Sequence, residues 1–401
     1  MDVRKAERLR QLPPFLFMET RRRIREARER GIDVISLGVG DPDGVTPPHV
    51  LAAFRAAAGD PAQRKYPAGE SRGLPALRRT TAGWYGRRFG VRLDPGAEVC
   101  ALIGSKEGNH HVALGLLDPG DVALVPDPAY PAYAAGAVLA GARVVSVPLR
   151  PERGYLLDPA DISPADARAA RLLWLNYPNN PTGAVATGEF FEEIVDFARR
   201  HDIVVINDNP YADLCFDGYR APSILAAAGA MDVAVEFTSL SKTYSMAGWR
   251  IGMAAGNRDV IDAIVKVKEN TDAGACTAVQ VAAVAALDGP QDAVADSVAV
   301  YRRRRDRTVA ALRDAGYAAA PPSATFYVWM AVPAGLTSTD FANRLLDAAG
   351  VVVIPGVGYG ARGEGFVRLS LAVPDERLDE ALARIVKAGD LSTKNDEGVR
   401  A

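Results

Sequence analysis

Two basic residues near the middle of the chain have surroundings that suit covalent chemistry on an aldehyde. Lys242 ends the sequence Ser-Leu-Ser-Lys, which follows the apolar run 233–237, and Arg250 lies eight residues further on. Desolvation at the end of a buried strand favours the neutral amine of lysine, which can attack an aldehyde and form a Schiff base. Arg250 stays charged and therefore suits a fixed phosphate dianion. Considered alone, the pair is better explained by a surface turn.

Three more polar clusters follow apolar runs, each where a strand is expected to end. They are Asn176–Gly183 after the run 171–175, Asn207–Tyr211 after 201–206, and Gly104–Gly108 after 98–103. In open α/β sheets, ligands bind beyond the carboxyl ends of the strands, where helix N-termini also hold anions. All four clusters therefore have the placement expected of a single ligand site.

The residue types in these clusters fit pyridoxal phosphate (PLP), an aldehyde cofactor. Its ring nitrogen stays protonated only beside a buried carboxylate, and Asp208 ends a run of Ile and Val. Asn180 and Tyr211 offer donors for the phenolate oxygen, and Tyr130 offers an aromatic face for the ring. Each has an ordinary alternative: a turn or helix cap for Asp208, an Asn-Pro turn for Asn180, and core packing for the tyrosines.

The cofactor phosphate needs hydroxyls, backbone N–H groups and a fixed positive charge. Ser105 and Lys106, at the expected start of a helix, offer N–H groups and a hydroxyl. Ser239 offers a second hydroxyl, and Arg250 offers the charge. A PLP site is therefore the interpretation that uses all four clusters.

Together these motifs resemble those of the fold-type I PLP enzymes, specifically the class I and II aminotransferases. The matching strings are Asn-Asn-Pro-Thr-Gly at 179–183, Asp-x-x-Tyr at 208–211, Ser-x-Ser-Lys at 239–242 and Arg-Leu-Ser at 368–370. The resemblance extends from Leu12 to about Lys387 and is closest to the branch of LL-diaminopimelate aminotransferases. That finer match rests on the strings at 12–17, 35–42, 104–108, 216–219 and 324–327.

The resemblance implies a role for each motif residue. Lys242 would be the Schiff-base lysine and proton shuttle, with Asp208 and Tyr211 as the other catalytic residues. The cofactor would be held by Ser105, Lys106 (through its backbone), Tyr130, Asn180, Asp208, Tyr211, Ser239, Lys242, Arg250 and Tyr66. Tyr66 would reach the phosphate of a neighbouring subunit, so that a homodimer shares its active sites.

The substrates implied by the resemblance are L-amino acids and 2-oxo acids. Arg368 would grip the substrate α-carboxylate as a bidentate pair, with the backbone N–H of Gly40 closing over it. Asn180 and Phe15 would also contact the substrate. The expected activity is therefore transfer of an amino group between an L-amino acid and a 2-oxo acid.

The apolar pattern predicts an α/β protein of the fold-type I PLP-dependent transferase class. Seven strand-like runs between Glu98 and Ala255 alternate with helical stretches, which argues for a mostly parallel seven-stranded sheet wrapped by helices. From about Val281 a long helix and then alternating strands and helices predict a smaller α/β domain. The expected division is 1–44 (N-terminal arm and part of the small domain), 45–285 (large PLP-binding domain) and 286–401 (C-terminal small domain).

Composition restricts the class of protein. The 401 residues, 48% of them hydrophobic, suffice for two domains, and a net charge of −2 gives no overall field to attract nucleic acid or membranes. No apolar run approaches the roughly 20 residues of a membrane helix. Three scattered cysteines and the lack of a visible secretory signal favour the cytoplasm, and no metal-ligand spacing is found. The basic cluster Arg302–Arg305 is expected on a solvated helix face.

Two other readings remain open from the sequence. The same lysine-centred site supports elimination or replacement at Cβ or Cγ of an amino acid, since fold alone does not decide chemistry. A PLP-binding regulator would need a DNA-binding domain, for which there is no room before Leu37. Departures from the branch occur at Phe15, Gly44–Val45, the loop 66–73 and the segment 271–276, so the donor and the acceptor stay open.

Overall fold

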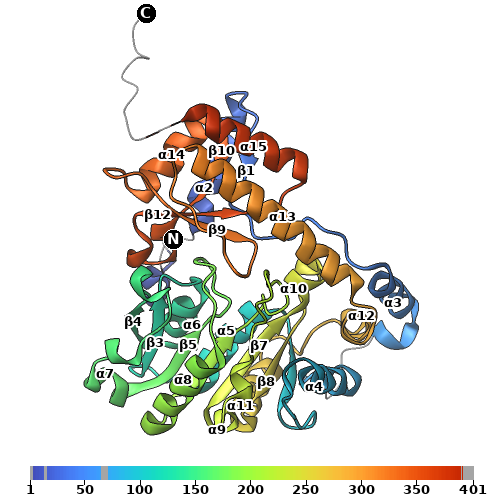
Figure 1. The fold of residues 1–401 in the computed structure, drawn as a ribbon. Coiled ribbons are helices and arrows are strands. Elements are labelled where there is room, and N and C mark those ends of the chain that lie inside the picture. Colours follow the sequence, from blue (N-terminus) through green and yellow to red (C-terminus); the bar gives the residue numbers. More distant parts are fainter. Residues whose placement is uncertain (1–2, 13–15, 65–70, 390, 392–401) are drawn as a thin grey trace, which may run out of the picture.

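The computed structural model describes residues 3–12, 16–64, 71–389 and 391, and these form a large lower part and a smaller upper part in Figure 1. The predicted site residues Phe15 and Tyr66 lie outside the described residues. The expected domain boundaries after residues 44 and 285 stay predictions.

A seven-stranded sheet forms the centre of the large part. Its strands, in order across the sheet, are β2 (Val99–Leu102), β8 (Gly252–Gly256), β7 (Ala234–Ser239), β6 (Val204–Asp208), β5 (Ala170–Leu175), β3 (Val122–Asp127) and β4 (Arg143–Pro148). Strand β8 runs antiparallel to β2 and β7, and the remaining pairs are parallel. The prediction of a mostly parallel seven-stranded sheet is confirmed.

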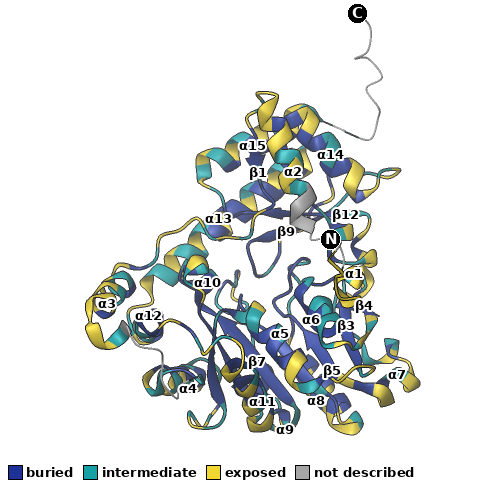
Figure 2. Cartoon of the chain, turned by 180° about the vertical axis from the view of Figure 1, so that it is seen from behind, coloured by how far each residue is buried: buried dark blue, intermediate teal, exposed yellow. Residues whose placement is uncertain are grey.

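Helices cover both faces of this sheet (Figure 2), so the central strands are almost entirely buried, whereas the edge strand β4 is largely exposed or half-buried. Successive side chains of β5 point to opposite faces: Leu173 belongs to the same hydrophobic cluster as Phe191 of α8 (Gly188–His201). Trp174 belongs to another cluster, with Val112 of α5 (Ser105–Leu116) and Ile264 of α11 (Arg258–Glu269). The helices of the large part are α3 (Pro48–Gly59), α4 (Pro75–Phe89), α5 (Ser105–Leu116), α6 (Ala132–Ala140), α7 (Pro164–Ala169), α8 (Gly188–His201), α9 (Ala230–Val233), α10 (Leu240–Thr243), α11 (Arg258–Glu269) and α12 (Thr277–Asp288).

Helix α8 illustrates how the sequence forms these elements. Thr187 caps it by accepting a hydrogen bond from the N–H of Phe190 at 3.3 Å, and Asp202 ends it in the left-handed conformation at φ 53°. Phe190, Ile194 and Phe197 recur at helical spacing and are buried. The predicted helix at 189–200 is confirmed.

The smaller part combines the C-terminal region with residues from the beginning of the chain. Strands β11 (Ile354–Pro355), β12 (Phe366–Ser370) and β9 (Tyr327–Ala331) form an antiparallel sheet in that order. Strand β1 (Ile35–Ser36) pairs in parallel with β10 (Val351–Val352). The helices of this part are α2 (Leu16–Glu29), α13 (Asp292–Asp314), α14 (Ser338–Ala349) and α15 (Asp375–Ala388), while α1 (Arg8–Gln11) lies beside α6. Segments from both ends of the chain therefore pack side by side (Figure 1).

Short 3-10 helices connect several of these elements. They are Pro61–Arg64, Pro151–Arg153, Pro159–Asp161, Ile224–Ala226, Ala247–Trp249, Gly356–Tyr359 and Ala361–Gly363. Within the described ranges, no helix has both the length and the apolar character needed to cross a membrane.

The prediction that Arg302–Arg305 forms a solvated face was wrong for two of the four arginines. Arg304 and Arg305 are only 5% and 4% exposed. Arg304 pairs with Asp43 and Asp375, and Arg305 pairs with Asp217 and Asp306. Asp43, Asp375 and Asp217 are distant in sequence, so the local charge pattern gave no sign of the burial.

Candidate active site

The carboxyl ends of the central strands border a cavity of about 250 Å³ beneath the smaller part. Every predicted site residue that the structure describes lines this cavity. These residues are Gly40, Ser105, Lys106, Tyr130, Asn180, Asp208, Tyr211, Ser239, Lys242, Arg250 and Arg368. The fold thus brings together side chains from both parts of the molecule.

Asp208, the last residue of β6, is a buried carboxylate with one side open to the cavity. Its Oδ2 accepts hydrogen bonds from Asn109 Nδ2 at 3.0 Å and from the Tyr133 hydroxyl at 3.1 Å. Its Oδ1 is buried and has no hydrogen-bond partner among the described residues. Burial raises the pKa of Asp208 to about 6, although the bonds from Asn109 and Tyr133 oppose this shift. A protonated ring nitrogen would supply the missing donor and a compensating charge, so this carboxylate fits PLP.

Another part of the cavity lining is suited to a phosphate. Helix α5 begins at Ser105, and the N–H groups and dipole at such a helix start favour an anion. Gly104 precedes it at φ +80°, and a Cβ there would lie 2.4 Å from Arg250 Nη2. The Arg250 side chain is anchored by donating to the carbonyl oxygens of Ala247 at 2.8 Å and Ile103 at 3.2 Å. A glycine is therefore required where the guanidinium meets the start of the helix.

Two further predicted phosphate contacts lie beside this helix start. Ser239 caps α10, where its hydroxyl accepts from the N–H of Ser241 at 3.2 Å. Lys106 lies in the first turn of α5, and burial, followed by the charge of Arg250, lowers the pKa of its ammonium. Hydroxyls, N–H groups and positive charge are thus gathered in this part of the cavity lining, as a phosphate dianion requires.

Lys242 extends from the short helix α10 toward the smaller part. Its Nζ donates to the carbonyl oxygen of Gly40 at 2.6 Å and lies 3.9 Å from the Asp41 carboxylate. The ammonium is also 5.9 Å from the centre of the Phe326 ring. The amine therefore lies in the same cavity as the Asp208 carboxylate and contacts the backbone at Gly40, which also lines this cavity.

Two predicted tyrosines form walls of the cavity. The Tyr211 hydroxyl lies 3.2 Å from that of Tyr327, and burial raises the pKa of Tyr211 well above its ordinary value. Tyr211 therefore stays a proton donor at neutral pH. Tyr130 packs edge-on against Tyr133 with ring centres 5.9 Å apart, and burial raises the pKa of Tyr130 to about 12. Whether Tyr130 stacks on a cofactor ring stays a prediction.

Arg368 is a buried cation whose described partners include no carboxylate. It is 2% exposed, and it donates to Asn180 Oδ1 at 2.7 Å and to the carbonyl oxygen of Gly38 at 2.9 Å. Its guanidinium carbon lies 3.9 Å from the centre of the Tyr327 ring. Its Nε is buried and has no partner among the described residues. Since an uncompensated buried charge is costly, an anionic ligand is needed to complete this site.

Sequence reasoning missed several residues that position the predicted ones. Asn109 and Tyr133 hold Asp208, Asn176 Nδ2 donates to the Asp208 carbonyl oxygen at 2.5 Å, and Tyr327 lies against Arg368. Asn109 follows Ser105 by one helical turn, which is a signal that could have been used. Tyr327 was noted only as part of a family string.

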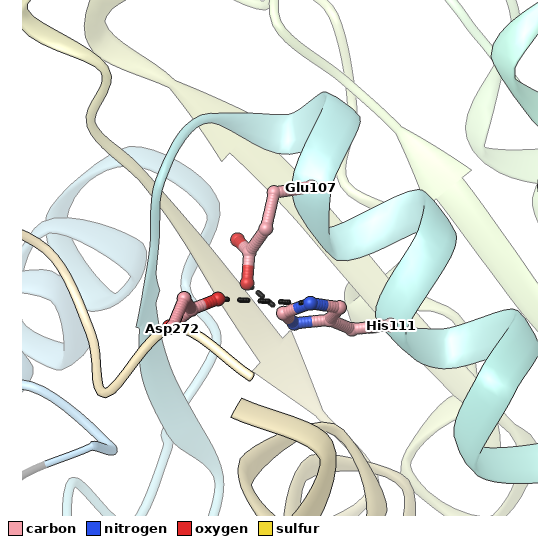
Figure 3. Close-up of side chains that lie close together, drawn as sticks. All are labelled: Glu107, His111 and Asp272. Carbon is pink, nitrogen blue, oxygen red and sulfur yellow. Dashed lines mark ion pairs between the residues drawn. The ribbon is translucent and has the colours of Figure 1, made fainter. Parts of the chain in front are cut away.

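A second polar cluster lies behind the start of α5 (Figure 3). Glu107 and His111 project from α5 toward Asp272, and ligand atoms of these three side chains lie within 4.8 Å of one another. Lys268, whose side chain is fully buried, donates to Glu107 at 2.8 Å and to Asp272 at 3.2 Å. Burial opposes its charge, but Glu107 and Asp272 raise the pKa of Lys268 above its ordinary value. The Lys268 ammonium already pairs with both carboxylates, so the cluster is better explained as an ion-pair network than as a metal site.

Comparisons with known proteins agree with this geometry. A family model described as aminotransferase class I and II matches residues 32–385. The LL-diaminopimelate aminotransferase of Dehalococcoides mccartyi (strain ATCC BAA-2266 / KCTC 15142 / 195) is 53% identical, over 95% of this chain and 97% of that protein. The enzyme of the same name from Desulforudis audaxviator is 51% identical, over 96% of this chain and 98% of that protein.

Solved structures give the same result. Substrate-bound BacF from Bacillus subtilis matches with a TM-score of 0.92 and 37% identity, covering 96% of this chain and 98% of that one. The aspartate aminotransferase of Thermus thermophilus with maleate matches with a TM-score of 0.89 and 33% identity, covering 96% and 100%.

Proposed function

The chain belongs to the class I and II aminotransferases and depends on PLP, and from this premise we propose that LL-diaminopimelate is one of its amino-acid substrates. It moves an amino group between an L-amino acid and a 2-oxo acid. The proposed substrate is supported by the names of relatives that are about 50% identical over nearly their whole length. The alternative of elimination or replacement gains no support from these relatives.

One observation supports the location of the reaction: a buried carboxylate and a buried guanidinium, each with an unfilled bonding position, line the same cavity. Asp208 Oδ1 lacks a donor, and Arg368 lacks a carboxylate partner, among the described residues. PLP, when bound, withdraws electrons from the substrate Cα. We assign its ring nitrogen to Asp208, its phenolate oxygen to Asn180 and Tyr211, and its ring face to Tyr130. Its phosphate is assigned to Ser105, Lys106, Ser239 and Arg250.

Lys242 is proposed to move the proton of the reaction. Its Nζ would take the proton from the substrate Cα and would return it to the carbon that carried the aldehyde of the cofactor. The carbonyl oxygen of Gly40, 2.6 Å from this nitrogen, orients the amine when it is not bonded to the cofactor. Tyr211 stays protonated because it is buried, so it donates rather than competes for this proton.

Arg368 is proposed to bind the substrate α-carboxylate. The planar guanidinium offers paired N–H groups, and its burial makes the ion pair stronger than it would be in water. Asn180 and Gly38 accept from the two Nη atoms and fix the orientation of the plane. The backbone segment around Gly40 shields the bound acid from water, and a Cβ at Gly40 would lie 2.2 Å from the Tyr327 hydroxyl.

We also propose that the enzyme is a cytoplasmic homodimer in which Tyr66 reaches the phosphate of the other subunit. Tyr66 lies outside the described residues, so this assignment rests on the motif alone. The free thiols Cys100, Cys215 and Cys276 are consistent with a reducing compartment.

The test is to add single amino acids to the PLP-loaded enzyme and to follow the cofactor absorbance and the released products. LL-diaminopimelate is expected to convert the cofactor to its amine form and to release one 2-oxo acid per site. The meso isomer and aspartate serve as controls and should react more slowly. Release of ammonia instead would favour elimination, and no conversion of the cofactor by LL-diaminopimelate would reject the proposed substrate.

A further inference from the structure

Two chain segments build the proposed α-carboxylate site, and they come from opposite ends of the sequence. One is the segment 38–40, whose Gly38 and Gly40 carbonyl oxygens accept from Arg368 Nη2 and Lys242 Nζ. The other is strand β12, which carries Arg368. The two are joined directly by the N–H of Ser370, which donates to the carbonyl oxygen of Leu37 at 2.6 Å.

A single buried guanidinium, that of Arg304, bonds to both segments just beyond the site. Its Nη1 and Nη2 donate to the two carboxylate oxygens of Asp43 at 2.7 and 2.9 Å. Its Nη1 also donates to the carbonyl oxygen of Leu371 at 3.1 Å, and its Nε donates to Asp375 at 2.7 Å. Asp43 is three residues after Gly40, and Leu371 is three residues after Arg368. Arg304 therefore links the two halves of the site through the chain that follows each of them.

The position of Arg304 on the long helix α13 makes this link rigid. The helix runs from the smaller part toward α12 and α3 of the larger part (Figure 1), and Arg304 is 5% exposed on it. Asp43 also accepts from the Tyr301 hydroxyl at 3.4 Å, but its neighbours are open to solvent, since the Asp41 side chain is 72% exposed and Val45 is 87% exposed. A bidentate arginine–carboxylate pair fixes both distance and orientation, which a lysine cannot do.

We propose that Arg304 is a positioning residue for substrate binding, and that its pair with Asp43 holds the segment 38–40 against Arg368. It contacts neither the substrate nor the cofactor. The inference deepens the proposed function and rests on Arg368 binding the α-carboxylate. A displacement of about 1 Å in such a site can reduce activity by ~10²-fold, so loss of the pair weakens binding of amino acids and 2-oxo acids alike.

The test compares Asp43→Asn and Arg304→Lys with the unaltered PLP-loaded enzyme. Both variants are expected to raise KM for the amino acid and for the 2-oxo acid by at least ~10-fold, with kcat reduced less. The cofactor absorbance and PLP affinity should stay unchanged. Asp43→Asn alters a partly exposed loop residue of nearly equal size, so it remains informative if Arg304→Lys does not fold.

Two controls separate positioning from a purely structural ion pair. Asp375→Asn removes the other carboxylate bound by Arg304 but leaves the Asp43 pair, so it should lower Tm while KM stays within about twofold. Arg303 lies on the same helix, has a side chain that is 54% exposed, and pairs with Asp375. Arg303→Lys should therefore change neither Tm nor KM. If Asp43→Asn lowers Tm but leaves KM unchanged, Arg304 has only a structural role and the inference is overturned.

A parallel Arg368→Lys variant distinguishes the two levels of the argument. If Arg368→Lys raises KM and the Asp43 and Arg304 variants do not, this inference fails and the proposed carboxylate site stands. If Arg368→Lys leaves KM unchanged, the proposed carboxylate site itself fails.

Discussion

At the scale of single residues, the cavity is defined by one buried acid and one buried cation, each with an open side. Asp208 and Arg368 are 3% and 2% exposed, and each is oriented by neutral neighbours rather than neutralised by an opposite charge. Burial without neutralisation costs stability, and proteins retain such groups mainly where a ligand completes them. The following three predictions test these groups and Lys242.

Asp208→Asn is expected to reduce turnover by at least ~10²-fold and to stabilise the cofactor-free protein. The pKa of Asp208 is about 6 in the folded chain against an ordinary 3.8, so the folded state binds the proton more tightly. Stability is therefore lost as pH rises through this window, by roughly 3 kcal/mol once pH exceeds 6. Asparagine avoids this loss because it never ionises.

Urea unfolding of both cofactor-free proteins at pH 8 and at pH 5 checks the second part of this prediction. The advantage of Asp208→Asn should be large at pH 8 and smaller at pH 5. An advantage that does not change with pH would mean that the carboxylate is not ionised against its burial.

Arg368→Lys is expected to raise KM steeply for amino acids and 2-oxo acids while the cofactor absorbance stays unchanged. An unmatched carboxylate in a closed site costs roughly 3–5 kcal/mol, because lysine cannot form two parallel charge-assisted bonds. Titration of the PLP-loaded variant with its best amino acid measures the loss. Unchanged affinity would remove Arg368 from the site.

Lys242→Ala is expected to abolish turnover, because it removes the amine proposed to move the proton. The other lysine that lines the described cavity, Lys106, is assigned to the phosphate. The variant should still bind PLP non-covalently through the remaining groups. Dialysis followed by absorbance measures the retained cofactor, and a coupled assay measures turnover. Near-normal rates in this variant would contradict the proposed role of Lys242.

At the scale of elements, the start of helix α5 is held by an ion-pair network on its far side. Glu107 lies in the first turn of the helix, accepts from the N–H of Ile103 at 2.9 Å, and binds Lys268 of α11. Burial would raise the pKa of Glu107, but the bonds from His111 and Lys268 lower it below its ordinary value. The network therefore stays charged and ties the predicted phosphate-binding end of α5 to α11.

Lys268→Met is expected to destabilise the protein by roughly 3–5 kcal/mol and to weaken PLP binding. It leaves two carboxylates without their buried counter-ion, and it frees the first turn of α5 to move. Lys266→Met on the same helix is the matched control, since Lys266 is 78% exposed, and it should change stability little. Urea unfolding and PLP titration measure both effects, and equal behaviour of the two variants would show that the network is dispensable.

At the scale of the whole molecule, the described chain holds nearly all of the proposed site, and the one residue assigned to a partner subunit is Tyr66. Mixing Tyr66→Phe chains with inactive Lys242→Ala chains tests this assignment. If Tyr66 crosses between subunits, a heterodimer contains one site with both defects and one with neither, so activity above the Tyr66→Phe level should return. No recovery after proven subunit exchange would show that Tyr66 serves its own subunit.

The sequence by itself predicted the sheet, which the structure confirms, and the residues that line the cavity, whose roles in the reaction stay predictions. Lys242, Asp208 and Asn180 follow apolar runs, and the carboxyl ends of parallel strands meet at one edge, so this placement alone predicts that they converge. Few residue types can form a Schiff base, hold a pyridinium or bind a phosphate. These roles could therefore be assigned from local strings.

Only the tertiary structure decided which side chains support those residues. Asn109 and Tyr133 meet Asp208, Lys268 meets Glu107, and Arg304 reaches Asp43 across 261 residues. A local pattern records whether a residue is polar, but it does not record which helix face packs against which loop. Arg304 was therefore predicted on a solvated face. The packing of α13 instead buries it beside Asp43. A buried guanidinium is stable only where the fold supplies its acceptors, and the tertiary structure alone shows where these are.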